Sequence, residues 1–386
     1  MFENVHPQYS IALWSIGNTA PSEDTQFPLR GPYSSLEKYE QREEPYRFSL
    51  DMVEQWAKTA FPMLPSNPGT VNALKSLSDA PMLDYEDESQ NWRALLVREL
   101  DATQDKETDD GETLMHFVDD RPDDFWPIYK GGSFNIWEPD TGIRYAWADP
   151  DRITRFLQED RKSSHGHWAS AFTEMDKEWV EDSSTLPCLS PRIAFRQITN
   201  RTNQRTVIPA LIPPETVLTH HAWYFIWPIG KECDQAYLLG ILSSIPFDWY
   251  ARRFVESNVT KSLMKTFPVP RDQPEKLRDR VVELAGRLAA VDDRYADWAG
   301  QVGVSCGPLN EEEKKDKIYE LDAVVAHLYG LSREHVEVIF ETFHDGWDYE
   351  KRLDRVLDYY ASWADKLDLD HANREEEQKA GTRNDD

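Results

Sequence analysis

One short stretch of the sequence combines residue types that could contact DNA. Four arginines lie between positions 183 and 214, and no acidic residue lies among them. They are Arg192, Arg196, Arg201 and Arg205. Arginine side chains can hold phosphate groups, and they can bind a guanine edge through two hydrogen bonds. The stretch therefore predicts contact with a polyanion, and DNA is the candidate to test.

The surrounding window differs in charge from the rest of the chain. Residues 183–271 contain ten Lys and Arg residues and five acidic residues, so the window carries about +5. The whole chain carries a formal charge of -27, which leaves about -32 for the remainder. A local basic segment within an acidic chain is typical of a binding site for a polyanion.

Two β-prone runs, 192–198 and 205–211, predict a hairpin with polar side chains at its tip. The connection contains Asn200, Asn203 and Gln204, whose amides could pair with adenine. The alternative is a solvated hairpin whose arginines pair with carboxylates elsewhere on the acidic surface.

Further basic residues could contact phosphates. Lys130 precedes a pair of glycines whose backbone amides could face a phosphate, although a plain turn explains them equally well. Arg252, Arg253, Lys261 and Lys265 follow the hairpin, and the first two could instead simply decorate a helix. The DNA-binding residues predicted here are Lys130, Arg192, Arg196, Asn200, Arg201, Asn203, Gln204, Arg205, Arg252, Arg253, Lys261 and Lys265.

Composition predicts a folded cytoplasmic protein. The 386 residues are 40% hydrophobic and 12% aromatic, which suffices for real cores. Three widely spaced cysteines argue against a disulfide framework, and no apolar run approaches the length of a membrane span. Seventy acidic residues against 43 basic ones suggest a halophile, in which high salt screens the repulsion. The alternative is an ordinary acidic protein that avoids nucleic acid.

Motifs for catalysis are absent from the sequence. There is no phosphate-binding glycine loop, dinucleotide fingerprint, zinc-protease helix or nucleophile elbow. Residues 212–215 (IPPE) differ from the methyltransferase loop, which begins with a polar residue and ends with an aromatic one. Histidines at 165, 167, 220 and 221 lack further ligands at metal spacing. We expect no catalytic residue and no metal site.

The periodicity predicts an α+β fold with helices in the C-terminal third. A strand is expected at 9–16, a helix at 234–244 capped by Asp234, and a further helix from Pro246 to Phe254. An apolar seam at alternating spacings of four and three runs from Leu277 to Trp298 and should pack on a helix through 318–328. Helices capped by Ser332 and running through 349–363 follow.

Several segments together resemble one family. The segments are FENVHPQYSIALWSI, YKGGSFNIWEPDTGIRYAWADP, PRIAFRQITNRTNQRTVIPALIPP, AYLLGILSSIPFDWYARRFV and LDAVVAHLYGLSREHVEVIFETF. In order and spacing they resemble the C-terminal region of large adenine-specific restriction-modification methyltransferases of the fused type IIG-like kind, which also occur in phage-defence islands. In that family the region comprises the end of the catalytic domain, a target-recognition domain and a helical tail.

The chain is expected to have four parts. By the resemblance, residues 1–30 would be terminal strands of a methyltransferase core, 31–271 a mixed, β-rich target-recognition domain and 272–365 a helical bundle. The charge of residues 366–386 predicts a disordered acidic tail. The family's cofactor-binding motif and its Asn-Pro-Pro-aromatic loop have no counterpart here. The chain would thus be a specificity part that recognises double-stranded DNA beside a separately encoded methyltransferase or restriction subunit, which would bind S-adenosylmethionine. The alternatives are a truncated methyltransferase fragment, a nuclease with an unrecognised site, and an interaction scaffold of a phage-defence complex without base recognition.

Overall fold

The computed structural model describes residues 15–381, with gaps at 16, 23, 32, 34, 42–43, 57–61, 66, 68, 86–91, 109, 200–202 and 272–273, and at 36, 38, 55, 56 and 369–381 it describes the backbone alone. The strands are β1 (Gln26–Leu29), β2 (Tyr46–Ser49), β3 (Arg93–Val97), β4 (Trp126–Tyr129), β5 (Ala146–Ala148), β6 (Arg192–Arg196), β7 (Pro209–Ile212), β8 (Val217–Leu218) and β9 (Ala222–Ile229). The α-helices are α1 (Leu36–Glu40), α2 (Leu50–Trp56), α3 (Thr70–Ser78), α4 (Pro150–His165), α5 (Lys177–Glu181), α6 (Glu232–Ser243), α7 (Ile245–Arg252), α8 (Lys261–Lys265), α9 (Glu275–Ala289), α10 (Ala296–Val302), α11 (Glu311–Leu328), α12 (Arg333–Glu341) and α13 (Glu350–Gly381). Short 3-10 turns include η1 (Gly131–Ser133), η2 (Ala171–Glu174) and η5 (Asp293–Tyr295).

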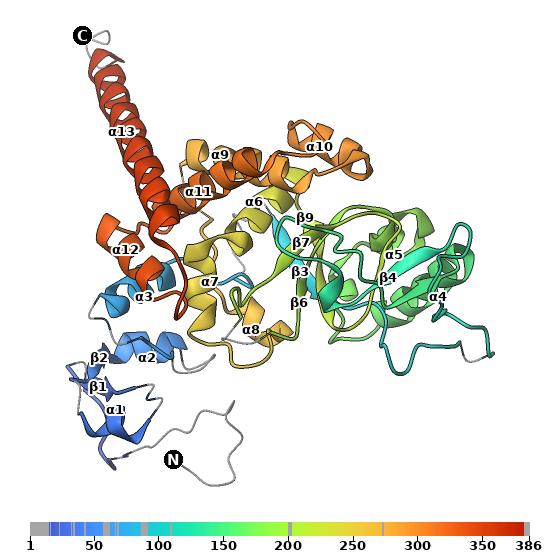
Figure 1. Cartoon of the computed structure of the whole chain (residues 1–386), viewed down its shortest axis with the longest axis horizontal. Helices are drawn as coiled ribbons and strands as arrows, with labels where there is room; N and C mark the ends of the chain where they lie inside the picture. Colours follow the sequence, from blue (N-terminus) through green and yellow to red (C-terminus); the bar gives the residue numbers. More distant parts are fainter. Residues whose placement is uncertain are drawn as a thin grey trace.

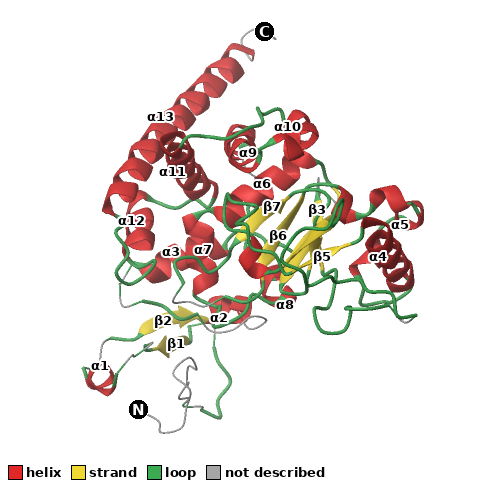
Figure 2. Ribbon diagram, turned by 45° about the vertical axis from the view of Figure 1, so that its right-hand side comes forward, coloured by secondary structure: helices red, strands yellow, loops and turns green. Residues whose placement is uncertain are grey.

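A four-stranded antiparallel sheet lies between the helical part and a smaller lobe. Its strand order is β3-β9-β6-β7, and β6 pairs with β7 as the predicted hairpin. Successive residues of β6 alternate between two apolar clusters, because side chains along a strand point to opposite faces. Phe195 faces the helices, whereas Ala194 faces the lobe. Figure 2 shows α6 on one side of these strands and α4 and α5 on the other.

The lobe is built on a three-stranded sheet, β5-β4-β8, in which β4 and β8 are parallel. Helix α4 covers it, and Ile153 and Leu157 from the helix pack against Ile128 of β4. The helix begins at Pro150 because the side chain of Asp149 accepts a hydrogen bond from the Arg152 amide. The helix runs to His165.

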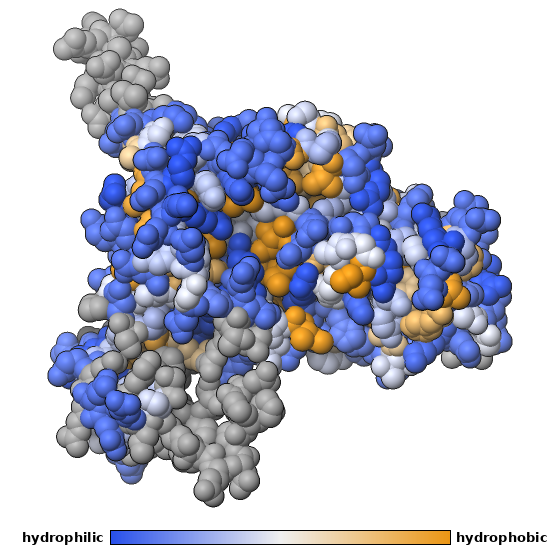
Figure 3. All heavy atoms as spheres, in the orientation of Figure 1, coloured by the Kyte–Doolittle hydropathy of each residue, from blue (hydrophilic) through white to orange (hydrophobic). Residues whose placement is uncertain are grey.

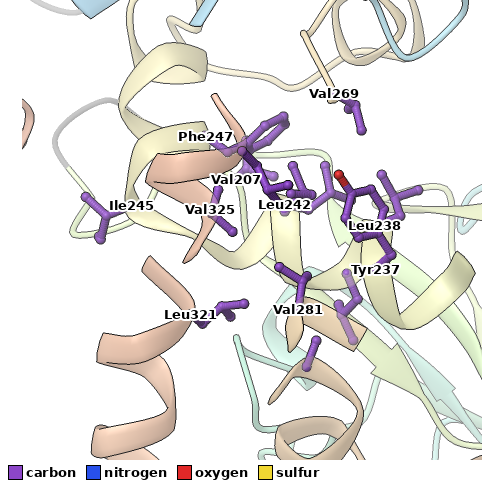
Figure 4. Close-up of a cluster of buried hydrophobic side chains, with 14 of the residues drawn as sticks. Val207, Tyr237, Leu238, Leu242, Ile245, Phe247, Val269, Val281, Leu321 and Val325 are labelled. Atoms are coloured by element: carbon purple, nitrogen blue, oxygen red, sulfur yellow. The ribbon is translucent and has the colours of Figure 1, made fainter. Parts of the chain in front are cut away.

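Helices α6, α7, α9 and α11 form the largest core, on the opposite face of the four-stranded sheet. Figure 4 shows Leu238 and Leu242 of α6 lying with Val281 of α9 and Leu321 of α11. Gly240 allows the close approach of α6 and α9, because a Cβ atom there would lie 2.6 Å from Cγ1 of Val281. The predicted packing of the 277–298 seam against the 318–328 helix is confirmed for the α9 part.

The seam is not one continuous helix, which corrects the sequence-based expectation. Helix α9 ends at Ala289, and α10 folds back against it. The side chain of Asp292 caps the short η5 turn by accepting a hydrogen bond from the Arg294 amide. Gly286 permits the return, because a Cβ atom there would lie 2.8 Å from Cγ1 of Val302. Trp298 still reaches the core, so the apolar spacing is genuine while the chain changes direction within it.

The helix ends agree with the sequence in most places. Ser332 caps α12 as predicted. Gly330, which follows α11, adopts a left-handed conformation with φ of 62°. Asp234 is not the N-cap of α6, however. Lys231 occupies that position, and the Asp234 carboxylate accepts from its amide at 2.7 Å. Helix α13 extends to Gly381, beyond the start of the tail that charge alone suggests is disordered.

Two parts of the predicted domain division, the strand at 9–16 and the boundary at 271/272, are not confirmed by the structure. The strand expected at 9–16 and its resemblance to the end of a catalytic domain lie outside the described residues. The boundary at 271/272 coincides with no break in the core, since the largest cluster joins Phe48, Phe195 and Leu284. The four-part division stays a prediction.

The molecular surface is predominantly hydrophilic on the face shown in Figure 3, in keeping with the acidic composition. Within the described ranges, none of the helices combines the length and the apolar character needed to cross a bilayer.

The α9 seam generates a stability prediction. Leu284 is 1% exposed in the core between α9 and its neighbours, so Leu284→Asp would bury a charge without a partner. We expect a loss of several kcal/mol in the free energy of unfolding measured by urea denaturation. Glu283→Gln on the exposed side of the same helix is the control. An unchanged urea midpoint for Leu284→Asp would show that the seam is not a core.

The ring of His327 stacks on Tyr360 at 4.0 Å, and Nε2 lies 2.8 Å from the Tyr360 carbonyl oxygen. Burial lowers the pKa of His327 below 6.5 in the folded chain. The unfolded chain therefore takes up a proton near pH 6.5, whereas the folded chain does so only at lower pH. Stability should fall as the pH drops from 7.5 to 5. His327→Gln keeps a donor for the carbonyl oxygen but does not titrate, so it should lose less stability over this range in urea titrations. Equal losses of stability in the wild-type and His327→Gln chains would contradict the inference that protonation of His327 contributes to this pH dependence.

Candidate nucleic-acid interface

The predicted hairpin pairs with a second, distant segment at its outer end. The Thr199 amide donates to the Ser257 carbonyl oxygen at 3.1 Å, and the Val259 amide donates to the Gln197 carbonyl oxygen at 2.8 Å. The loop that precedes α8 thus lies along the start of the β6–β7 connection. Two segments about sixty residues apart in sequence therefore form one surface.

Asp248 anchors the return of the hairpin. Its carboxylate has no exposed surface, and it accepts from Arg205 Nε at 2.5 Å. The amides of Thr206 and Val207 also donate to it, at 3.1 and 2.8 Å. Arg205 additionally donates to the Ser243 carbonyl oxygen at 2.7 Å. This buried ion pair fixes the backbone that follows the tip, because every polar partner is supplied from within the protein.

Arg252 supports the tip from beneath. One of its terminal nitrogens donates to the carbonyl oxygens of Asn203 and Gln204 at 2.8 and 2.9 Å. The guanidinium carbon lies 4.4 Å from the centre of the Phe343 ring, and the side chain is buried. Burial lowers the pKa of Arg252, and the nearby Asp248 carboxylate opposes that shift. Arg252 therefore positions the tip through backbone contacts.

Arg253 and Arg192 are buried as well. Arg253 donates to the Trp249 carbonyl oxygen at 3.0 Å, and burial lowers its pKa. Arg192 contacts both oxygens of Glu99, at 2.7 and 2.9 Å, and the side chains of this pair are 4% and 3% exposed. Glu99 also accepts from the Leu218 amide at 2.6 Å. The pair joins β6 to the β8 segment of the lobe.

Arg196 and Lys130 meet at the other end of β6. Arg196 Nε donates to the Phe134 carbonyl oxygen at 3.0 Å, just after the η1 turn. Lys130 precedes that turn, and its ammonium lies 6.0 Å from the centre of the Tyr145 ring. The double glycine is therefore part of a turn that Arg196 fastens to the sheet. The two sites expected to bind phosphate separately are one structural unit.

At the outer end of the hairpin lie two exposed amide residues of the predicted set and two half-buried lysines. Asn203 and Gln204 are exposed at the tip, while Asn200 and Arg201 lie outside the described residues. Lys261 and Lys265, one helical turn apart in α8, flank the same loop surface. Lys265 contacts Asp84 at 2.8 Å, and burial followed by the charge of Lys265 lowers the pKa of Lys261.

The structure thus separates the candidates by role. Arg192, Arg196, Arg205, Arg252 and Arg253 make contacts inside the protein, so their contact with DNA stays a prediction that this geometry does not favour. Two of them pair with carboxylates, but these are the buried Glu99 and Asp248 rather than carboxylates on the acidic surface. The exposed groups are the two amides, Asn203 and Gln204, and two half-buried lysines lie beside them. Such a surface can contact base edges through the amides and phosphates through the lysines.

Sequence-based reasoning missed Ile198 and Asn258, which form an isolated antiparallel pair at this surface. Ile198 lies in the predicted run, but a lone isoleucine there looks like core. Asn258 stands in the segment ESNVT, whose small polar residues indicate an exposed loop. Nothing local in the sequence indicates that this loop pairs with residue 198.

A solved structure resembles this chain weakly. The chain matches no protein-family model and no curated protein. Among solved structures it is similar to MmeI, a type IIL restriction-modification enzyme in complex with DNA, with 14% identity and a TM-score of 0.34. The match covers 78% of this chain and 39% of MmeI, so the chain spans about two fifths of the length of that protein. At so low an identity and TM-score, the likeness carries no argument about function.

The anchoring role of Asp248 generates a prediction. Asp248→Ala leaves Arg205 and two backbone amides without their buried partner, so we expect a loss of about 3–5 kcal/mol in the free energy of unfolding. Hydrogen exchange at the Thr206 and Val207 amides should also accelerate.

Asp358→Ala is the matched control. It removes a carboxylate 3.5 Å from Arg355 in a pair that is 71% and 51% exposed, and it should change stability by less than about 1 kcal/mol. Equal effects of the two substitutions, measured by urea denaturation, would contradict an anchoring role for Asp248.

Proposed function

We propose that this chain recognises a specific sequence in double-stranded DNA, as the specificity part of an adenine methyltransferase or restriction-modification system. A separately encoded catalytic part would supply the methyltransferase or restriction chemistry and bind S-adenosylmethionine. The observation that carries the proposal is the exposure of the Asn203 and Gln204 amides on a backbone that the buried Arg252 and the partly buried Arg205 hold from beneath. The ordered resemblance of several segments to restriction-modification methyltransferases also supports it.

Charge favours recognition through such amides. A protein that carries -27 gains little long-range attraction to DNA, and high salt removes most of the free energy of counterion release. Hydrogen bonds from Asn and Gln to adenine involve no net charge, so they depend less on ionic strength. Lys261 and Lys265 would contribute the few phosphate contacts that set the position of the protein on the duplex.

A specific observation also favours the scaffold hypothesis. Figure 1 shows α13 projecting from the helical part toward the C-terminus. A long projecting helix offers a surface for a protein partner, and this use needs no base recognition. Sequence-dependent binding to duplex DNA distinguishes the two functions.

The experiment begins with selection of duplexes from a random pool by the full chain, followed by titration against the enriched and a scrambled duplex. The double substitution Asn203→Ala and Gln204→Ala should weaken binding to the enriched duplex by about 1–3 kcal/mol for each adenine that these amides bind. Binding to the scrambled duplex should change little, because the phosphate contacts remain.

Gln104→Ala, an exposed amide in the lobe, is the control for this titration. Thermal unfolding confirms that each variant is folded. A wild-type chain that enriches no sequence would contradict DNA recognition and favour the scaffold. A wild-type chain that enriches a sequence which the double variant binds equally well would exclude the tip as the contact.

A further inference from the structure

Ile198 and Asn258 stand opposite each other in an antiparallel pair. The two hydrogen bonds beside them, Thr199 to Ser257 and Val259 to Gln197, flank the pair rather than joining its members. In this arrangement the Cα atoms approach to about 4.5 Å, and the two side chains lie next to each other on one face. The isoleucine side chain and the asparagine amide are therefore immediate neighbours.

Both side chains face solvent on a fixed backbone. Ile198 is 60% exposed, and Asn258 is exposed too, with Nδ2 3.2 Å from Ser257 Oγ. Val255 and Val259, on either side of the asparagine, are fully buried in the main core. The Gln197 amide donates to the His221 carbonyl oxygen at 2.9 Å, which ties the isoleucine side to β9. Two exposed side chains held this way form a preorganised contact.

The chemistry of the pair matches one base pair. An asparagine amide can bind N6 and N7 of adenine through two hydrogen bonds, and an apolar side chain can contact the C5-methyl group of thymine. Both features are present only in the major groove, which is wide enough to admit a two-stranded ribbon. Glu256, the acidic residue of this loop, is exposed and would repel a phosphate, so base edges suit this surface better than the backbone does.

We propose that Ile198 and Asn258 determine specificity for an A·T base pair in the major groove, with the amide on adenine and the isoleucine on the thymine methyl group. The inference rests on the proposed DNA recognition and adds a contact beside the tip residues Asn203 and Gln204.

The test combines protein variants with altered bases in the enriched duplex. Replacing thymine by uracil at the contacted position removes one methyl group and should weaken wild-type binding about fourfold, which corresponds to the burial of one such group. The Ile198→Ala chain should not distinguish thymine from uracil. Replacing adenine by 7-deazaadenine removes the N7 acceptor and should weaken wild-type binding about tenfold, whereas Asn258→Ala should bind both duplexes alike.

Two exposed residues provide controls. Ile229→Ala removes an isoleucine that is 50% exposed at the far end of β9, and Asn72→Ala removes an exposed amide on α3. Both variants should retain the wild-type response to the altered bases. The base substitutions test the wild-type chain directly, so the result does not depend on the folding of any variant.

The outcomes separate this inference from the proposed function. If the wild-type chain enriches a sequence but ignores both altered bases at every A·T position, the pair is not a specificity determinant, although DNA recognition stands. If the wild-type chain enriches no sequence, both proposals are overturned together, and the exposed isoleucine would then be a protein contact.

Discussion

A carboxylate with no exposed surface must find hydrogen-bond partners within the protein, and Asp248 finds them in a segment 41 to 43 residues before it in the chain. Arg205 and two backbone amides close around it, and they fix the chain just after the hairpin tip. Arg252, one helical turn later, holds the carbonyl groups of Asn203 and Gln204. Helix α7 is thus the buried support of residues 203–207.

These internal contacts give the positive charge of residues 183–271 a structural explanation. The sequence places ten cations there, yet five arginines, three buried and two partly buried, bond to carboxylates or carbonyl oxygens of the protein. These hydrogen bonds offset much of the cost of burying the guanidinium groups, and the removal of the partners would be costly. The window is basic mainly because the fold needs rigid, multiply bonded donors at the junction of hairpin, helices and lobe.

Local rules predicted much of the helical part and little of the interface. Ser332 was identified because a helix cap depends only on the adjacent residues. The break after α9 was missed, because the apolar spacing continues through the turn that Asp292 caps. The partners of Arg192 and Arg205 could not be predicted, since Glu99 and Asp248 lie 93 and 43 residues away. The candidate site depends on such distant pairings, so only its amides at 203 and 204 and its lysines at 261 and 265 could be proposed from sequence.

The pairing of β3 with β9 has a consequence for biosynthesis. Val97 pairs with Tyr224, so well over a hundred residues separate the two strands. At ordinary translation speeds, β3 would wait on the order of ten seconds for its partner. Its residues Leu95, Leu96 and Val97 form an apolar edge during that time. The lobe, which is encoded between the strands and has its own apolar cluster, can become compact first and bring the two strand ends together. We therefore expect the lobe to fold before the β3–β9 pairing forms, which would shorten the time for which the edge of β3 is exposed.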